Sequence, residues 1–536
     1  MSVPPEPPPT IGSRIPWLRI LAAVVFAISY TQSPLYYSNQ NQYFLHALAE
    51  AGVGDLSSDW LANTRDPTPL FSRTACLTYQ VAGEWPFQVV YFVLLMAYFL
   101  ALCCIAQALP FFPRFAQGEL TFAAGMIVVH SGIVRVMSVQ LFGVDYPWYL
   151  QAGVANQYLL GPGLQPSAFG VLLLIALAAF VSGRPVLGGF LAAATCGLHS
   201  TYLLPAGLLV AGMMLALVNT GRTRMAVLTG TVALVGVAPV LAYNLRTFAP
   251  TSAAEFADAQ RILAEVRIPH HAVVARWFDG IAGLQIAWLM VGMMAFRRTT
   301  LFPVMAVMAG GGFVLTLAQV ATRNPTLALV FPWRESTVLV PMATAAACAG
   351  LARFAELRLP INVGILLGFA AILVSVAGAG WVYSERLGYQ VSVAEDGLMN
   401  FVRTTRQSGA LYLLPAGFPK PATSRGVGSS TFVPVPPTDR PAVFELQRFR
   451  LGTGAAVFVD FKSVPYHDAE VREWLRRVEQ VVEWYGQPDW DASGTVDAVR
   501  AIGITHVVVP AGVTIHSTRL KPVYHDAGYR VFRVRQ

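Results

Sequence analysis

The run Phe87-Gln-Val-Val-Tyr-Phe-Val-Leu-Leu-Met-Ala-Tyr-Phe-Leu-Ala-Leu-Cys-Cys-Ile-Ala-Gln-Ala-Leu-Pro110 contains no charged residue. A bilayer core is about 30 Å thick, and a helix needs roughly 20 predominantly apolar residues to cross it. The whole chain has this character, because it is 55% hydrophobic and only 12% charged, with a mean hydropathy of +0.53. Soluble proteins are far less apolar, so the sequence predicts a multi-pass membrane protein.

Similar apolar blocks, bounded by arginine, proline or polar clusters, recur along the chain. They predict a mainly α membrane protein with about 11 transmembrane helices, followed by a small C-terminal extracytoplasmic α/β domain. The predicted spans are 17–35, 87–110, 119–139, 166–182, 185–199, 201–219, 224–243, 279–296, 299–321, 335–352 and 361–383. Only His199-Ser200-Thr201 divides the pair 185–199 and 201–219. If these two spans were one helix, the tail would lie on the other side of the membrane.

The distribution of charge predicts the domains. Half of the charged residues, 33 of 66, lie in the last 152 positions, from Glu385 onward. We therefore expect an N-terminal cytoplasmic tail 1–16, a polytopic transmembrane domain 17–384 with an outer loop 36–86, and a water-facing domain 385–536. In that last domain, β-branched and apolar runs predict strands and the spacing of apolar residues predicts an amphipathic helix. The strands are Leu411–Leu414, Ala455–Val459, Thr505–Val509 and Arg530–Val534, and the helix is 468–485.

Arginines predict the orientation in the membrane. With eleven spans, every short loop on one side carries basic residues, namely Arg14, Arg19, Arg114, Arg184, Arg222, Arg224, Arg297, Arg298, Arg353 and Arg358. The positive-inside rule then places the N-terminus in the bacterial cytoplasm and the C-terminal domain outside the cytoplasmic (inner) membrane. The net charge of +8 reflects this topology and does not imply binding of nucleic acid.

The outer loop contains the candidate catalytic residues. It reads Asn39-Gln-Asn-Gln-Tyr43, Asp59-Trp-Leu-Ala-Asn-Thr64 and Asp66-Pro-Thr-Pro69. A carboxylate at the rim of a cavity can act as a general base, or can ligate a divalent cation that neutralises phosphate. Asp59 and Asp66 are therefore candidates, with a role in a helix cap or turn as the alternative for each. Asn39 and Gln42 are candidate substrate ligands, and the sequence identifies no set of metal ligands.

Ionisable side chains near the outer ends of the spans are further candidates, because charges in membrane segments usually face a cavity, a partner or water. These candidates are Arg73, Arg135, His199, Arg334 and Glu335. A guanidinium such as that of Arg334 can clamp the phosphate of a lipid-linked substrate. The alternative is an interfacial anchor, with Trp333 in the aromatic belt. The pair His270-His271 lacks the HExxH spacing and is weak evidence for a metal.

Four runs resemble those of a bacterial family of uncharacterised multi-pass membrane proteins. They are Asn39-Gln-Asn-Gln-Tyr43, Asp59-Trp-Leu-Ala-Asn-Thr64 with Asp66-Pro-Thr-Pro69, Phe331-Pro-Trp-Arg-Glu335, and Phe458-Val-Asp-Phe-Lys-Ser-Val-Pro-Tyr466. More remotely, the plan of the chain resembles the GT-C superfamily of membrane glycosyltransferases. That resemblance implies a catalytic acid in the first outer loop, here Asp59 or Asp66, and a polyprenyl-phosphate sugar as donor. The chain departs from the pattern because its loop has no Asp-Asp or Glu-Asp dyad.

The leading hypothesis is therefore a GT-C-like glycosyltransferase that uses a polyprenyl-phosphate-linked sugar at the outer face of the cytoplasmic membrane. Its partners would be the lipid-linked sugar and membrane lipids, with a divalent cation left open. In the tail, Asp460-Phe-Lys462 and Tyr466-His467 would grip the acceptor or close the domain onto the membrane body. The alternatives are a membrane transporter, which the lack of a clear internal repeat disfavours, and a non-catalytic envelope assembly or scaffold protein.

Overall fold

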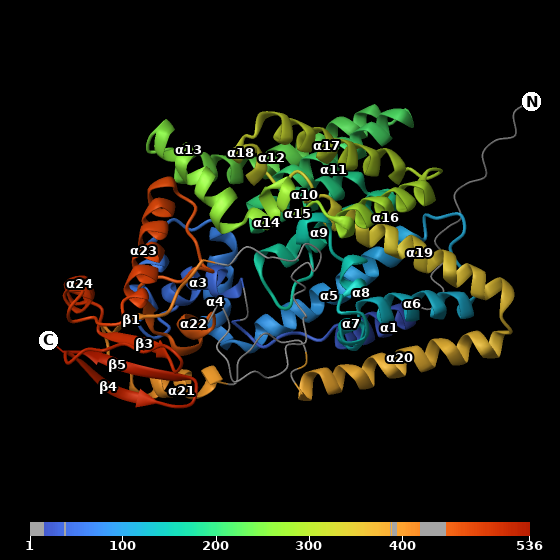
Figure 1. Ribbon diagram of the computed structural model, residues 1–536. Helices are drawn as coiled ribbons and strands as arrows, with labels where there is room; N and C mark the ends of the chain where they lie inside the picture. Colours follow the sequence, from blue (N-terminus) through green and yellow to red (C-terminus); the bar gives the residue numbers. More distant parts are fainter. Residues whose placement is uncertain (1–15, 37–38, 386, 388–393, 419–445, 536) are drawn as a thin grey trace, which may run out of the picture.

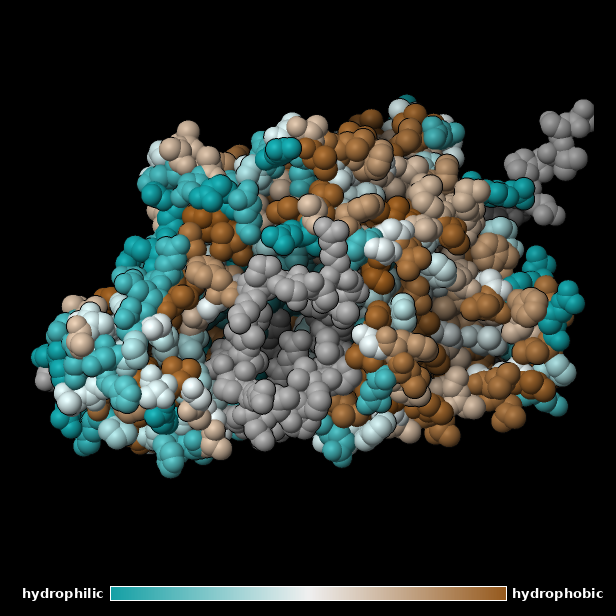
Figure 2. Space-filling view, in the orientation of Figure 1, coloured by the Kyte–Doolittle hydropathy of each residue, from teal (hydrophilic) through white to brown (hydrophobic). Residues whose placement is uncertain are grey.

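The computed structural model describes residues 16–36, 39–385, 387, 394–418 and 446–535. Figure 1 shows long helices that lie beside one another, with a small sheet and its helices at one end of them. Hydrophobic side chains cover much of the helical part in Figure 2, while hydrophilic side chains gather over the sheet and again at the far end of the helices. A hydrophobic band between two hydrophilic ends suits a bilayer. The chain is a mainly α-helical membrane protein.

Six helices in the described part of the chain are long and apolar enough to cross a membrane. They are α5 (Trp85–Ala106), α11 (Leu203–Asn219) with the turn before it, α12 (Thr223–Thr247), α17 (Leu301–Thr322), α19 (Ser336–Arg358) and α20 (Ile361–Ser384). The pair α6 (Ala116–His130) and α7 (Gly132–Phe142), bent by 57°, makes a seventh if it is one span. Shorter apolar helices are α1 (Pro16–Tyr30), α9 (Val171–Val181), α10 (Pro185–Leu198) and α16 (Gly280–Phe296). Each predicted span coincides with one of these segments, and the number of eleven crossings stays a prediction.

The segment 185–219 forms two helices. His199 has an extended backbone (φ −154°, ψ 109°), which ends α10 at Leu198. The 3-10 turn η5 (Ser200–Tyr202) follows, and α11 then packs back against α10. The chain therefore reverses direction at His199. The predicted side of the tail depended on a break at this residue, and the break is present.

The basic ends of the helices gather away from the sheet. Arg19, in the first turns of α1, has its Nη2 3.1 Å from Oε1 of Glu119 near the start of α6. The backbone N–H of Arg114 donates to Oε1 of Glu356, near the end of α19, at 3.0 Å. The opposite ends of α1, α5 and α20 share a pocket of about 780 Å³ with residues of the tail. Which side of the membrane each end occupies stays a prediction.

The outer loop is a packed part of the protein. Its elements are α2 (Gln40–Tyr43), α3 (Leu45–Glu50), η1 (Leu56–Ser58), η2 (Leu61–Asn63) and α4 (Pro69–Ala82). Phe44, Leu45 and Leu48 are fully or almost fully buried and belong to the core of the apolar helices. The ring of Phe44 meets that of Phe87, at the start of α5, edge to face at 4.8 Å. This burial of apolar side chains fixes the loop on the membrane body.

Two irregular stretches connect apolar helices near the tail. The first holds α8 (Tyr146–Tyr149), η3 (Val154–Asn156) and η4 (Pro166–Gly170). The second holds α13 (Ala253–Arg261), the π-helix η6 (Ile262–Arg267), α14 (Pro269–Ala272) and α15 (Val274–Trp277), and α18 (Pro325–Leu329) precedes α19. π-Helices are rare and occur frequently at functional sites, so this second stretch is of interest for function.

The tail contains α21 (Ala394–Thr405), β1 (Leu411–Leu413), α22 (Phe449–Thr453), β2 (Ala456–Val457), α23 (Asp468–Gly486), α24 (Thr495–Ala501), β3 (His506–Pro510), β4 (Leu520–His525) and β5 (Tyr529–Val534). The strand order is β2-β1-β3-β5-β4, with β2, β1 and β3 parallel and β5 antiparallel to both of its neighbours. The four predicted strands and the predicted helix are present. β4 was missed because Lys521 and Pro522 interrupt its apolar pattern, as an edge strand allows.

Polar contacts hold the tail against the membrane body. The backbone N–H of Asp55 donates to the carbonyl of Gly454 at 2.8 Å. A Cβ on Gly54 would lie 2.3 Å from that same carbonyl oxygen, so only glycine allows this approach. On the other flank, Thr251 donates its hydroxyl and its backbone N–H to Asp468 at 2.8 and 2.7 Å. The outer loop and the tail therefore form one continuous surface.

Candidate functional site

Ten side chains meet where the outer loop, the ends of the apolar helices and the tail come together, and we call this group the junction site. Its members come from six separate segments, so only the folded chain assembles them. They are Tyr43, Tyr158, His199, Tyr202, Arg267, His270, His271, Arg334, Lys462 and Tyr466.

Arg334 lies in the turn between α18 and α19. The turn begins at Phe331, a non-glycine residue in the left-handed region (φ 53°), and such strain tends to occur at functional sites. The guanidinium carbon of Arg334 lies 4.7 Å from the centre of the Tyr202 ring, a cation–π distance. Its Nε is buried and has no hydrogen-bond partner among the described residues. The turn therefore holds a cation with donor capacity to spare.

His199 lies next to Arg334. Its Nε2 is 3.5 Å from the hydroxyl of Tyr43, and its ring meets that of Tyr202 edge to face at 5.9 Å. The side chain is 6% exposed, and Nδ1 has no partner in the described part of the chain. The break between α10 and α11 thus brings His199 close to Arg334.

Arg267 and Lys462 form a second pair of cations. Arg267 is the last residue of the π-helix, is 8% exposed, and donates from Nη2 to the carbonyl of Lys462. Its Nε lacks a hydrogen-bond partner within the described residues. This contact joins the membrane body to the tail loop after β2.

The two histidines of α14 connect the cation pairs. Their ring centres are 4.1 Å apart, and the His271 ring lies 6.4 Å from Phe331 at the start of the Arg334 turn. His271 Nδ1 is 2.6 Å from the carbonyl of Ala155. Ala155 and Asn156 both have positive φ, 59° and 55°. Strained backbone therefore surrounds the junction site on two sides.

The outer loop closes the remaining side. Gln42 donates from Nε2 to the hydroxyl of Tyr466 at 2.9 Å, and Asn39 donates from Nδ2 to the hydroxyl of Tyr158 at 3.4 Å. Both amides were predicted to bind substrate, and both lie at the edge of the junction site. Contacts link Arg334 to Tyr202, Tyr202 to His199, and His199 to the outer loop, which in turn contacts the tail. The helix α14 contacts the turn that carries Arg334.

The charges of the junction site are unbalanced. Among the described residues, Arg267, Arg334 and Lys462 form no ion pair with a carboxylate. Burial, and then the charge of Arg267, lowers the pKa of Lys462 to about 7, against an opposing effect of Asp460. Burial also lowers the pKa of His271 to about 4. Arg267 is buried, and Arg334 and Lys462 are half-buried. Cations withdrawn from water without counter-ions are costly, so this arrangement is suited to bind an anion.

Asp59 is part of an internal ion pair. Its side chain is fully buried, and its Oδ2 accepts from Nε of Arg450 at 2.7 Å and from the backbone N–H of Val457 at 2.8 Å. Oδ1 accepts from the backbone N–H of Leu61 at 2.9 Å. Arg450 also pairs with Asp460. This carboxylate therefore fastens the outer loop to the tail.

Asp66 is more open. It is half-buried, and its Oδ1 accepts from the backbone N–H of Thr68 at 2.8 Å just before α4, the turn role named as the alternative. Oδ2 makes no hydrogen bond among the described residues. Gln42, Tyr43, Pro67 and Thr68 line one narrow crevice together with residues of the tail. Asp66 thus flanks a crevice that borders the junction site.

The other predicted residues lie apart from this centre. Arg135 is fully buried and pairs with Asp145 at 2.8 Å, with Trp148 stacked 4.5 Å from its guanidinium. Arg73 is exposed and pairs with Glu50. Glu335 is fully buried, and neither carboxyl oxygen has a hydrogen-bond partner within the described residues. The cations of Arg135 and Arg73 are therefore already compensated.

Sequence reasoning missed Arg267 altogether and assigned His270-His271 only weak evidence for a metal. The π-helix that places Arg267 has no readable signature. The sole hint was the density of basic residues, Arg267, His270 and His271, in a loop between two apolar spans.

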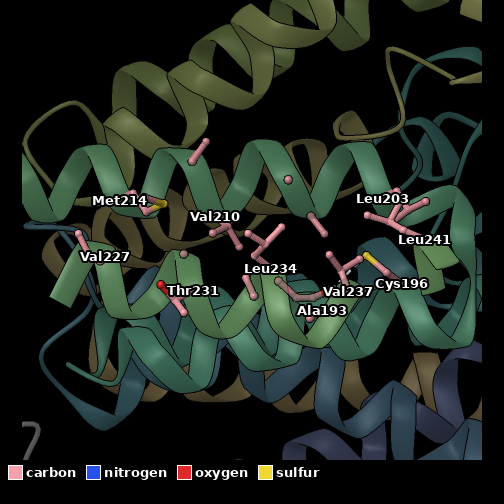
Figure 3. Close-up of a pocket in the computed structure, with 16 residues that line it drawn as sticks. Ala193, Cys196, Leu203, Val210, Met214, Val227, Thr231, Leu234, Val237 and Leu241 are labelled. Atoms are coloured by element: carbon pink, nitrogen blue, oxygen red, sulfur yellow. Dashed lines mark hydrogen bonds between the residues drawn. The ribbon is translucent and has the colours of Figure 1, made fainter. Parts of the chain in front are cut away.

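A groove between apolar helices lies outside the junction site. Figure 3 shows a groove of about 630 Å³ between α10, α11 and α12. Apolar side chains such as Val210, Leu234 and Leu241 line it, and it holds no ionisable group apart from the thiol of Cys196. It is suited to bind an apolar chain and not to catalysis.

No three His, Cys, Asp or Glu side chains in the described ranges come together as metal ligands.

Comparisons with known proteins give two matches. Residues 433–481 match a family described as a domain of unknown function, DUF6798. This segment includes the run Phe458 to Tyr466 and confirms the resemblance to a family without an established activity. The chain is also similar to the crystal structure of ArnT from Cupriavidus metallidurans bound to undecaprenyl phosphate, at a TM-score of 0.36 and 12% identity, over 96% of this chain and 97% of that chain. No curated protein matches.

Proposed function

We propose that this chain is a GT-C-like membrane glycosyltransferase that uses a polyprenyl-phosphate-linked sugar at the outer face of the cytoplasmic membrane. The junction site is the observation that carries the proposal. Arg267 ends the π-helix and Lys462 lies in the tail loop after β2, and neither they nor Arg334 has a carboxylate partner among the described residues. Arg334 lies just before the apolar helix α19. A phosphate attached to a membrane-embedded chain presents its charge at this level, and guanidinium groups bind phosphate oxygens well.

The roles of the residues follow from their environments. Arg334 holds the phosphate that leaves the sugar, with the hydroxyls of Tyr43 and Tyr466 nearby. The acceptor hydroxyl attacks the anomeric carbon, the bond from that carbon to the phosphate oxygen breaks, and the lipid phosphate departs with the bonding electrons. Asp66 takes the acceptor's proton, because Oδ2 is available. Asp59, whose oxygens are occupied by Arg450 and two backbone N–H groups, positions the loop.

Transfer of a labelled sugar from polyprenyl phosphate in vesicles tests the proposal. Loss of one charged hydrogen bond to phosphate costs about 2 kcal/mol, so Arg334→Gln should reduce transfer about 30-fold. Asp66→Asn should also abolish most transfer, since an amide cannot accept the proton. Arg73→Gln is the matched control, because Arg73 is exposed and paired with Glu50. Wild-type transfer by both Arg334→Gln and Asp66→Asn, with folding intact, would refute the assignment.

A further inference from the structure

The cations of the junction site lie in two groups, Arg334 in the turn before α19 and Arg267 with Lys462 beside the tail. Arg334, Arg267 and Lys462 contribute three cations when Lys462 is protonated. Two carboxylate charges oppose them. Arg450 balances only one of its two partners, Asp59 and Asp460, and Asp66 adds a second charge at the border of the site. His270 and His271 are held neutral, since burial lowers the pKa of each. About one positive charge therefore remains, and the cations lie in two groups.

Glu335 does not change this balance. Its carboxyl is fully buried against α17, where its Oε1 would lie 1.7 Å from a Cβ on Gly312. It has no hydrogen-bond partner within the described residues. A charged carboxylate without hydrogen bonds is far more costly to bury than a neutral carboxyl, so Glu335 is counted as neutral.

Buried polar atoms without hydrogen-bond partners occur in both groups of the site. In the described part of the chain, Nε of Arg334 and Nδ1 of His199 have no partner in the first group. In the second group, Nε of Arg267 and Oγ of Ser463, the residue after Lys462, also have no hydrogen-bond partner among the described residues. Unsatisfied buried polar groups are few in folded proteins, and each requires an explanation. An anion with several oxygens, long enough to reach both groups, would satisfy them.

The two groups share neighbouring side chains. His271 lies between them, with its partner His270 4.1 Å away and Phe331 of the Arg334 turn 6.4 Å away. The charges of Arg334, Lys462 and Arg267 all act on its imidazole and help to lower its pKa. Tyr43 is a second shared neighbour, since it contacts His199 and its hydroxyl also acts on Arg267.

We propose that the lipid donor is a diphosphate: Arg334 with His199 binds one phosphate, and Arg267 with Lys462 and Ser463 binds the other. This inference rests on the proposed function and specifies its substrate class. A monophosphate diester has one charged phosphate group, whereas a diphosphate diester has two, one for each of the two groups of cations and unpartnered polar atoms. A lipid diphosphate and a nucleoside diphosphate sugar share this chemistry, and the membrane level of the site selects the lipid.

Binding of undecaprenyl phosphate and undecaprenyl diphosphate to the purified full-length chain in nanodiscs tests this proposal. At pH 6 the diphosphate should bind at least tenfold more tightly. Lys462→Gln should remove most of that preference because it should weaken binding of the diphosphate more than binding of the monophosphate, while Lys462→Arg should retain the preference. Arg334→Gln should weaken both lipids. Equal binding of the two lipids by the wild-type chain, or equal weakening of both by Lys462→Gln, would overturn the inference.

A pH series supplies a readout that a structural role of Lys462 would not produce. Because its pKa lies at about 7 in the free protein, the preference for diphosphate should fall as pH rises from 6 to 9, and Lys462→Arg should keep it constant. Displacement of the lipid by a UDP-sugar at equal concentration would overturn the choice of a lipid donor. Transfer from a monophosphate donor with no diphosphate preference would refute this inference alone. If neither lipid binds and neither supports transfer, the proposed function fails with it.

Discussion

Substitution of Asp59 by asparagine would measure how strongly the outer loop is fastened to the tail. Asp59 is fully buried and accepts three hydrogen bonds, one of them from the guanidinium of Arg450. Removal of one partner of a buried ion pair costs about 3–5 kcal/mol. Arg450 keeps Asp460, and asparagine keeps one acceptor oxygen, so we expect the lower end, about 3 kcal/mol.

Hydrogen exchange of the full chain in micelles would report this change locally. The backbone N–H groups of Leu61 and Val457 donate to the Asp59 carboxylate. Their exchange reflects opening of the contact, and about 3 kcal/mol corresponds to exchange roughly 100-fold faster. Glu50→Gln, which breaks the exposed pair with Arg73, is the control, because exposed pairs contribute about 0–1 kcal/mol. Exchange in Asp59→Asn that equals the wild-type rate would refute the structural role of this ion pair.

Three further outcomes are expected. Gly312→Ala should weaken lipid binding by displacing the turn that carries Arg334, because its Cβ would lie 2.6 Å from the carbonyl of Pro332. Gly310→Ala on the same helix meets nothing within 4 Å and should bind normally in the same assay. Arg135→Gln should lower the melting temperature markedly, since it leaves a buried carboxylate without its partner at a cost of about 3–5 kcal/mol; an unchanged melting curve would contradict this. Inorganic diphosphate should protect the wild-type chain from thermal unfolding more at pH 6 than at pH 9, as Lys462 loses its proton through a pKa of about 7; equal protection at the two pH values would argue against a protonated Lys462 in the site.

The helices were readable from the sequence for a simple reason. A bilayer requires about 20 apolar residues in succession, and such runs are local, so each predicted span coincides with a helix or the bent pair. The tail strands and the helix 468–485 were readable because their apolar spacing is also local. β4 could not be recognised, because Lys521 and Pro522 interrupt its apolar pattern and an edge strand does not need that pattern.

The candidate residues divide in the same way. Residue type and position near the end of a span were enough to select His199 and Arg334, which the structure brings together beside Tyr202. The same reasoning also selected Arg135, whose partner Asp145 lies ten residues further along, just before α8. Sequence position cannot distinguish a compensated cation from a free one.

The sequence by itself therefore determined that this chain is a helical membrane protein with a polar loop and a charged tail. Only the tertiary structure decided which charges are satisfied. Arg450 comes from the tail to neutralise Asp59, nearly 400 residues away in the chain, while Arg267 and Lys462 meet across the junction without a carboxylate partner among the described residues. The physical reason is that membrane insertion depends on the summed hydropathy of a local segment, whereas the net charge of a buried site depends on which distant side chains share it.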